Sequence, residues 1–179
     1  MAKLITFMDR LANWRGIGIL LVLYALVFGA IVVTLSQLTA LTGGIGMLDF
    51  DRGYTLERVQ EVFDSYGEAG FTLYGHIQLL DLFNPAIYSL LFACFIYLLW
   101  VGRKNIWVVL IPLAAGFLDY AENLTLYLLS SSYPDLSPQL VSFSSTLSII
   151  KNLVLFGAIA ALLIGLIFRI RQRLSTKQS

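Results

Sequence analysis

Four long apolar segments constrain the fold of this chain more than any other feature. They cover residues 16–38, 84–100, 106–129 and 140–168. A helix needs about 20 mainly apolar residues to cross the roughly 30 Å hydrocarbon layer of a bilayer. The second segment reaches this length if its helix begins near Phe71. The sequence therefore predicts an all-α integral membrane protein with four spans.

Composition supports a lipid environment rather than water. The 179 residues are 58% hydrophobic and 13% charged, whereas soluble domains carry about 25% charged residues. One cysteine, Cys94, excludes an intramolecular disulfide, and one histidine, His76, excludes a multi-histidine metal centre. No tract is long enough for a separate soluble domain. We therefore expect residues 1–179 to form a single membrane domain, with no cofactor and no nucleic-acid partner.

The first segment has an alternative interpretation as a cleaved signal peptide, because basic residues precede it. Its apolar run is longer than the hydrophobic region of a typical signal peptide, and no A-x-A cleavage site follows it. We therefore expect a retained span.

The distribution of charge predicts the orientation of the spans. Basic residues cluster before the first span, between the second and third, and after the fourth: Lys3, Arg10, Arg15, Arg103, Lys104, Arg169, Arg171, Arg173 and Lys177. Acidic residues dominate the other two connections: Asp49, Asp51, Glu57, Glu61, Asp64, Glu68 and Asp135. Cytoplasmic loops are enriched in lysine and arginine. The sequence thus predicts a multi-pass protein of the cell membrane (plasma or inner membrane) with both termini in the cytoplasm.

The connections predict how the spans pack. Short connections favour antiparallel neighbours, so we expect an up-down four-helix bundle. In the first external loop, residues 56–66 have the pattern of an amphipathic helix, with Thr55 as its cap and Gly67 at its end. We expect this helix to pack on top of the bundle, and a lid over a site is the alternative. Pro85 is expected to kink the second span.

Polar residues from all four spans are predicted to share one level of the membrane. With a rise of about 1.5 Å per residue, these residues lie about 18 to 32 Å above the cytoplasmic ends of their helices. Asp119, Glu122 and Asn123 follow an i, i+3, i+4 pattern, which places them on one helix face. The further members of this polar level are Thr34, Ser36, Gln37, Asp81, Asn84, Ser144, Ser148, Lys151 and Asn152.

An ion pair between Lys151 and Glu122 or Asp119 follows from this placement. A charged residue at the bilayer centre costs about 3 kcal/mol on insertion scales, so these groups should face one another rather than lipid. If both acids stay ionised, one carboxylate is in excess, and either a proton or a further cation balances it.

The functional hypothesis is a site for an amphipathic molecule, such as a lipid or an isoprenoid, that enters from the outer leaflet. Glu122 and Asp119 would act as acid or base, and Lys151 would hold an anionic group. Further ligand contacts would come from Asn84, Asn123, Asp81, Asn152 and Ser148. The sequence leaves open whether the protein is an enzyme.

Other hypotheses compete with a ligand site. The polar groups can instead hold the helices together in a structural subunit that meets a membrane-protein partner or a second copy of itself. An ion or proton pathway is disfavoured, because the inner halves of the spans contain few polar residues. A metal site built from Asp81, His76, Asp119 and Glu122 is the weakest alternative.

Three stretches together carry a family resemblance. The sequences LDLFNPAIY (80–88), LDYAEN (118–123) and TLSIIKN (146–152) resemble a group of small bacterial membrane proteins with four predicted spans. The resemblance covers roughly residues 50 to 155. It departs at Asn84, where members of the group place phenylalanine before the proline. The resemblance implies a bacterial source. It also implies that the D-x-x-E-N pattern of residues 119–123 belongs together with Lys151, but it implies no activity or ligand.

Overall fold

The computed structural model describes residues 2–51, 53–100 and 106–176, and within them every regular element is a helix. Arg103, Lys104 and Lys177, which contributed to the charge prediction, lie outside the described residues. The α-helices are α1 (Ala2–Leu11), α2 (Trp14–Leu41), α3 (Leu56–Leu80), α4 (Asn84–Trp100), α5 (Leu110–Ser132) and α6 (Pro138–Thr176). Two short 3-10 helices are η1 (Leu48–Phe50) and η2 (Ile106–Val109).

Four helical stretches in the described residues are long and apolar enough to cross a membrane. They are Trp14–Leu41, Leu56–Trp100, Ile106–Ser132 and Pro138–Leu174. Their outer surfaces carry large apolar side chains, such as Phe117 and Leu153, which are 75% and 71% exposed. Apolar surface on this scale is unusual in a soluble protein. The prediction of an all-helical protein with four helices suited to a bilayer is therefore confirmed.

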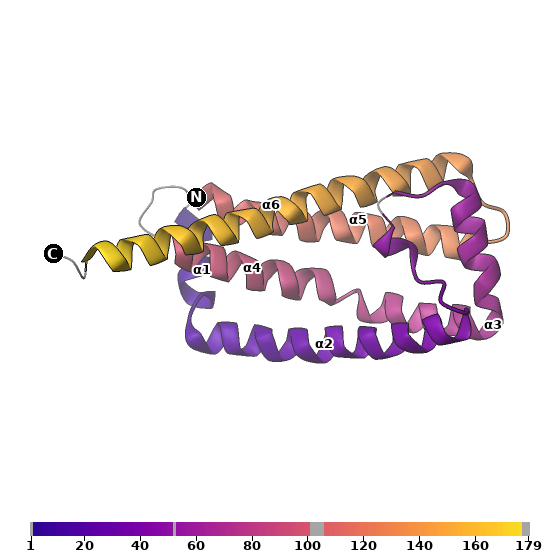
Figure 1. Cartoon of the computed structure of the whole chain (residues 1–179), viewed down its shortest axis with the longest axis horizontal. Coiled ribbons are helices and arrows are strands. Elements are labelled where there is room, and N and C mark those ends of the chain that lie inside the picture. Colours follow the sequence, from indigo (N-terminus) through magenta and orange to yellow (C-terminus); the bar gives the residue numbers. More distant parts are fainter. Residues whose placement is uncertain (1, 52, 101–105, 177–179) are drawn as a thin grey trace.

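The long helices lie side by side along the long axis of the molecule (Figure 1). Helix α2 packs against α3 and α4, and α6 packs against α4 and α5. One apolar cluster includes Phe63, Tyr66 and Leu126, while a second includes Met8 and Cys94. Met8 belongs to α1, so the segment that the sequence indicated only as a basic arm is a helix with one residue in the core.

The helix α3 is bent at Gly67, whose φ of +55° and ψ of −168° are not helical. A positive φ is accessible to glycine because it has no Cβ. The part before the bend begins at Thr55, whose side chain accepts a hydrogen bond of 3.4 Å from the Arg58 N–H. The bend divides α3 where the sequence places the end of the amphipathic helix.

The second apolar segment differs from its prediction. A turn at residues 81–83 separates α3 from α4, so the helix expected to run from Phe71 through this segment is interrupted. Pro85 is the second residue of α4 rather than an interior one. In the first turn its missing N–H breaks no helical hydrogen bond, so Pro85 begins a helix instead of kinking one.

Helices α4 and α5 approach closely at Gly116. A Cβ at this position would lie 2.7 Å from Ser89 Oγ and 2.9 Å from the Pro85 carbonyl oxygen. We expect Gly116→Ala to lower the free energy of unfolding by about 1 to 3 kcal/mol, because the added methyl forces the helices apart. Thermal unfolding in mild detergent measures the effect. Gly29→Ala is the matched control, because no atom lies within 4 Å of its Cβ position. Equal melting temperatures for the two variants would contradict this close contact.

Candidate functional site

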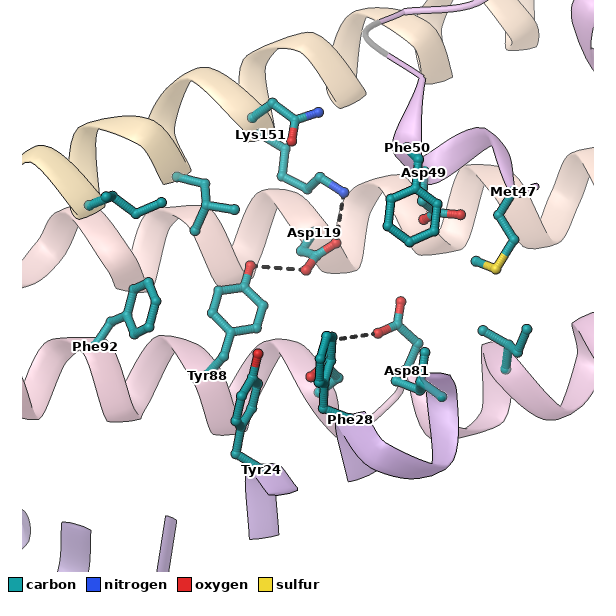
Figure 2. Close-up of a pocket in the computed structure, with 16 residues that line it drawn as sticks. Tyr24, Phe28, Met47, Asp49, Phe50, Asp81, Tyr88, Phe92, Asp119 and Lys151 are labelled. Atoms are coloured by element: carbon teal, nitrogen blue, oxygen red, sulfur yellow. Dashed lines mark hydrogen bonds and ion pairs between the residues drawn. The ribbon is translucent and has the colours of Figure 1, made fainter. Parts of the chain in front are cut away.

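A cavity of about 310 Å³ lies where α2, α4, α5, α6 and the α2–α3 connection meet. Figure 2 shows polar side chains from several elements facing this space, with aromatic rings beside them. Its polar and titratable lining residues are Tyr24, Asp49, Asp81, Asn84, Tyr88, Asp119, Lys151 and Asn152. Its apolar lining residues are Phe28, Ile31, Met47, Phe50, Ile77, Phe92, Leu155 and Ile159. The cavity is therefore amphipathic.

One wall of the cavity holds an ion-pair network. Lys151 Nζ lies 3.3 Å from Asp119 Oδ1 and also pairs with Glu122 Oε2. The side chains of Lys151 and Asp119 are each 10% exposed, and that of Glu122 is fully buried. The second oxygen of Asp119 accepts a hydrogen bond of 2.9 Å from the Tyr88 hydroxyl. The ion pair predicted from helical spacing is present, and Lys151 bridges both acids.

A second polar group lies where α3 passes into α4. Asn84 Nδ2 donates a hydrogen bond of 3.0 Å to Asp81 Oδ1, which links the end of one helix to the start of the next. The Asn84 Oδ1 atom is buried and has no hydrogen-bond partner. Asn84 therefore brings an unsatisfied acceptor to the cavity.

Asp49 of η1 brings a further carboxyl group. The residue is half-buried, but its Oδ2 atom is buried and has no hydrogen-bond partner. Burial disfavours the charged form and raises the pKa of Asp49 from 3.8 to about 7. The negative charges of Glu122, Asp81 and Asp119 raise this pKa further, while Lys151 lowers it.

Hydrogen bonds hold the α2–α3 connection against α6. The Tyr54 N–H donates to Ser145 Oγ at 2.9 Å, and the Tyr54 hydroxyl lies 2.7 Å from Ser144 Oγ. Ser144 in turn lies 2.6 Å from Thr125 Oγ1. Gly43 and Gly44, with φ of +69° and +102°, follow the end of α2 and let the chain turn back. These contacts position Asp49 at the cavity.

Five of the eight residues proposed from the sequence line this cavity: Asp81, Asn84, Asp119, Lys151 and Asn152. Glu122 and Ser148 are fully buried and do not line it. Glu122 contacts Lys151, while Ser148 Oγ has no hydrogen-bond partner.

Asn123 is separated from this group. It lines a different cavity of about 460 Å³ with Tyr120 and Tyr127, and its Nδ2 donates to the Asp81 carbonyl oxygen at 3.4 Å. The expectation that Asn123 joins Asp119 at one site was therefore wrong. Successive residues of an α-helix are about 100° apart, so Asn123 and Glu122 point to opposite sides of Asp119.

The sequence interpretation missed Asp49 and Tyr88 as cavity residues. Asp49 was counted only as an external charge, although its position between Leu48 and Phe50 was a signal of burial. Tyr88 follows Asn84 by one helical turn, which places both on one face of α4. Within the described parts of the chain, no three His, Cys, Asp or Glu residues lie close enough to hold a metal ion.

Comparison with known proteins adds no assignment. No protein-family model, curated protein or solved structure matches this chain.

Proposed function

We propose that this protein is a multi-pass membrane protein that binds an amphipathic small molecule in the cavity beside Lys151. The observation that carries the proposal is the composition of the cavity, in which carboxyl, amide and hydroxyl groups share one space with aromatic and aliphatic side chains. Ligand pockets are typically about 300 to 1,000 Å³ and mainly apolar, with a few polar groups that orient the ligand. The head of such a molecule contacts the polar wall, and its chain contacts the apolar residues.

The gap between α2 and α6 supports entry of the ligand from the bilayer. Each of these helices packs on α4; α2 otherwise packs mainly on α3, and α6 packs mainly on α5, with a smaller contact to α3. Apolar lining residues from both sides are exposed at the surface: Phe28 is 44%, Phe50 68% and Ile159 38% exposed. A hydrocarbon chain that leaves the cavity here passes directly into lipid.

The proposal includes an up-down four-helix bundle in the cell membrane, with both termini in the cytoplasm. Figure 1 supports this arrangement, because successive long helices run in opposite directions. The cavity then lies in the outer half of the membrane. The group of small bacterial four-span proteins remains the proposed family.

Binding, rather than catalysis, is the function that the geometry supports best. Glu122, which the sequence suggested as an acid or base, lies behind Lys151 and does not line the cavity. The ion pairs of Lys151 also support a second candidate function, in which this network fixes the packing of α5 on α6 in a structural subunit. The buried acceptors of Asp49 and Asn84 favour the ligand site, because helix packing leaves them unsatisfied.

Filling the cavity tests the proposed function. We expect Leu155→Trp to remove most of the amphiphile that co-purifies with the wild-type protein, because the indole occupies the space of the ligand chain. Mass spectrometry of the gently extracted protein measures the bound molecule per chain. Leu163→Trp is the control, since this α6 residue is 56% exposed and away from the cavity. An equal yield of the molecule from both variants, or none from the wild type, would contradict the proposal.

A further inference from the structure

The positively charged side chain at the cavity, Lys151, already forms ion pairs within the protein. Lys151 Nζ contacts both Asp119 and Glu122. Among the described residues that line the cavity, no other is a lysine, arginine or histidine. Lys151 is therefore poorly placed to hold an anionic head group, because it would have to leave two buried carboxylates.

Negative charge is in excess around the cavity. Asp49, Asp81 and Asp119 line it and Glu122 lies behind it, so four carboxyl groups face one ammonium group. Lys151 contacts Asp119 and Glu122, and neither Asp49 nor Asp81 has an ion pair with a described basic residue. A buried carboxylate without a counter-charge is costly, and a cation beside it offsets part of that cost.

The unsatisfied atoms at the cavity are acceptors rather than donors. Asp49 Oδ2 and Asn84 Oδ1 are buried without hydrogen-bond partners. Two of the donors beside these atoms are already used, because Asn84 Nδ2 donates to Asp81 and the Tyr88 hydroxyl donates to Asp119. A ligand that satisfies this cavity therefore brings N–H groups or positive charge.

Aromatic rings line the cavity beside these acceptors. Tyr24 and Phe28 stack with their ring centroids 5.2 Å apart, and Tyr88 meets Phe92 edge to face at 6.2 Å. Figure 2 shows the rings of Phe28 and Phe50 facing the same cavity as Asp49 and Asp81. The face of an aromatic ring attracts a cation within about 6 Å of its centroid. Carboxylates and rings together form the environment that ammonium groups prefer.

We propose that the cavity binds the ammonium head group of a single-chain cationic amphiphile between Asp49 and Asp81, with its chain leaving between α2 and α6. This inference rests on the proposed function and names its ligand class. The volume of about 310 Å³ equals that of about ten water molecules, which suits a small head group and the first carbons of a chain. Lys151 offsets one of the two negative charges of Asp119 and Glu122, and the ligand offsets one of the two negative charges of Asp49 and Asp81.

Three probes with one chain length test the charge of the head group: dodecylammonium, dodecyl phosphate and dodecanol. Binding to the protein in maltoside micelles is measured at pH 8, with binding to protein-free micelles subtracted. We expect the cationic probe to bind at least tenfold more tightly than the other two. Asp49→Asn and Asp81→Asn should each weaken it by about tenfold, because each removes one charged partner. Asp135→Asn, at an exposed acid away from the cavity, should leave it unchanged.

The Leu155→Trp variant separates failure of this inference from failure of the proposed function. If dodecyl phosphate or dodecanol binds more tightly and Leu155→Trp abolishes that binding, the cavity is a ligand site and the ammonium assignment is wrong. If Leu155→Trp affects no probe, both proposals fail. Cationic binding that is unchanged in both Asp49→Asn and Asp81→Asn would also overturn the placement of the head group.

Discussion

Replacing Lys151 with methionine should lower the free energy of unfolding by about 3 to 5 kcal/mol, the largest loss that we expect from a single substitution in this chain. The ammonium group contacts Asp119 and Glu122, and all three side chains are at most 10% exposed. Without the ammonium group, the two buried carboxylates have no counter-charge. They must then either take up a proton or repel each other. The long side chain of methionine keeps most of the packing, so the loss reports mainly on charge.

Chemical unfolding in mild detergent measures this loss, and the Glu122→Gln variant completes a double-mutant cycle. We expect the double variant to be more stable than Lys151→Met alone, because it removes one of the two orphaned acids. Arg58→Met is the control. Arg58 pairs with Asp51 and Glu61 but its side chain is 33% exposed, so its loss should cost no more than about 1 kcal/mol. Additive effects of Lys151→Met and Glu122→Gln would show that the ion pair does not stabilise the fold.

Replacing Asp49 with asparagine should raise the free energy of unfolding at pH 8 by an amount on the order of 3 kcal/mol. A rise of the Asp49 pKa from 3.8 to about 7 corresponds to about 4 kcal/mol, and partial exposure of the side chain reduces this value. Burial raises the pKa of Asp49 from 3.8 to about 7. The folded protein thus retains the proton between these pH values, while the unfolded chain has released it. Ionisation of Asp49 therefore opposes folding as pH rises from about 4 to 7, and the full penalty applies above about pH 7. Asparagine has no such penalty.

Unfolding of the wild type and Asp49→Asn at pH 5 and pH 8 measures this effect, and the difference in stability should be larger at pH 8. Charged groups from other elements also affect the pKa of Asp49. Asp81, Asp119 and Glu122 raise it, and Lys151 lowers it. Asp135→Asn, which removes an exposed acid that does not line the cavity, is the control variant in both measurements. A gap between wild type and Asp49→Asn that is independent of pH would contradict a raised pKa at this position.

The helices of this protein were predictable because their signal is local. Long apolar runs such as 16–38 and 140–168 must be helical to cross a bilayer, and the structure has α2 and α6 there. The break between α3 and α4 was harder to predict. Asn84 and Pro85 begin α4 with cap-like chemistry, but Leu82 and Phe83 continue the apolar composition of the segments on either side, so composition did not predict the turn.

Part of the site was also predictable, because side chains one turn apart on a helix point the same way. The spacing of Asp119 and Glu122 on α5, and of Ser148 and Lys151 on α6, placed acids opposite the lysine, and the ion pairs are present. The same rule failed for Asn123. A helix face more than 100° wide contains residues that point into two different cavities, and spacing does not separate them.

The sequence by itself determined the helical segments and their suitability for a bilayer, because both follow from the length and periodicity of the apolar runs. It also determined the polar level that α5 and α6 share, because charged side chains are costly in lipid and therefore face one another. Only the tertiary structure decided that Asp49 joins this level and that Lys151 is engaged by two acids. Asp49 lies on a connection rich in glycine, whose path depends on contacts such as Tyr54 with Ser144, 90 residues away in the chain. No local pattern encodes such contacts, and they change the expected ligand from an anion to a cation.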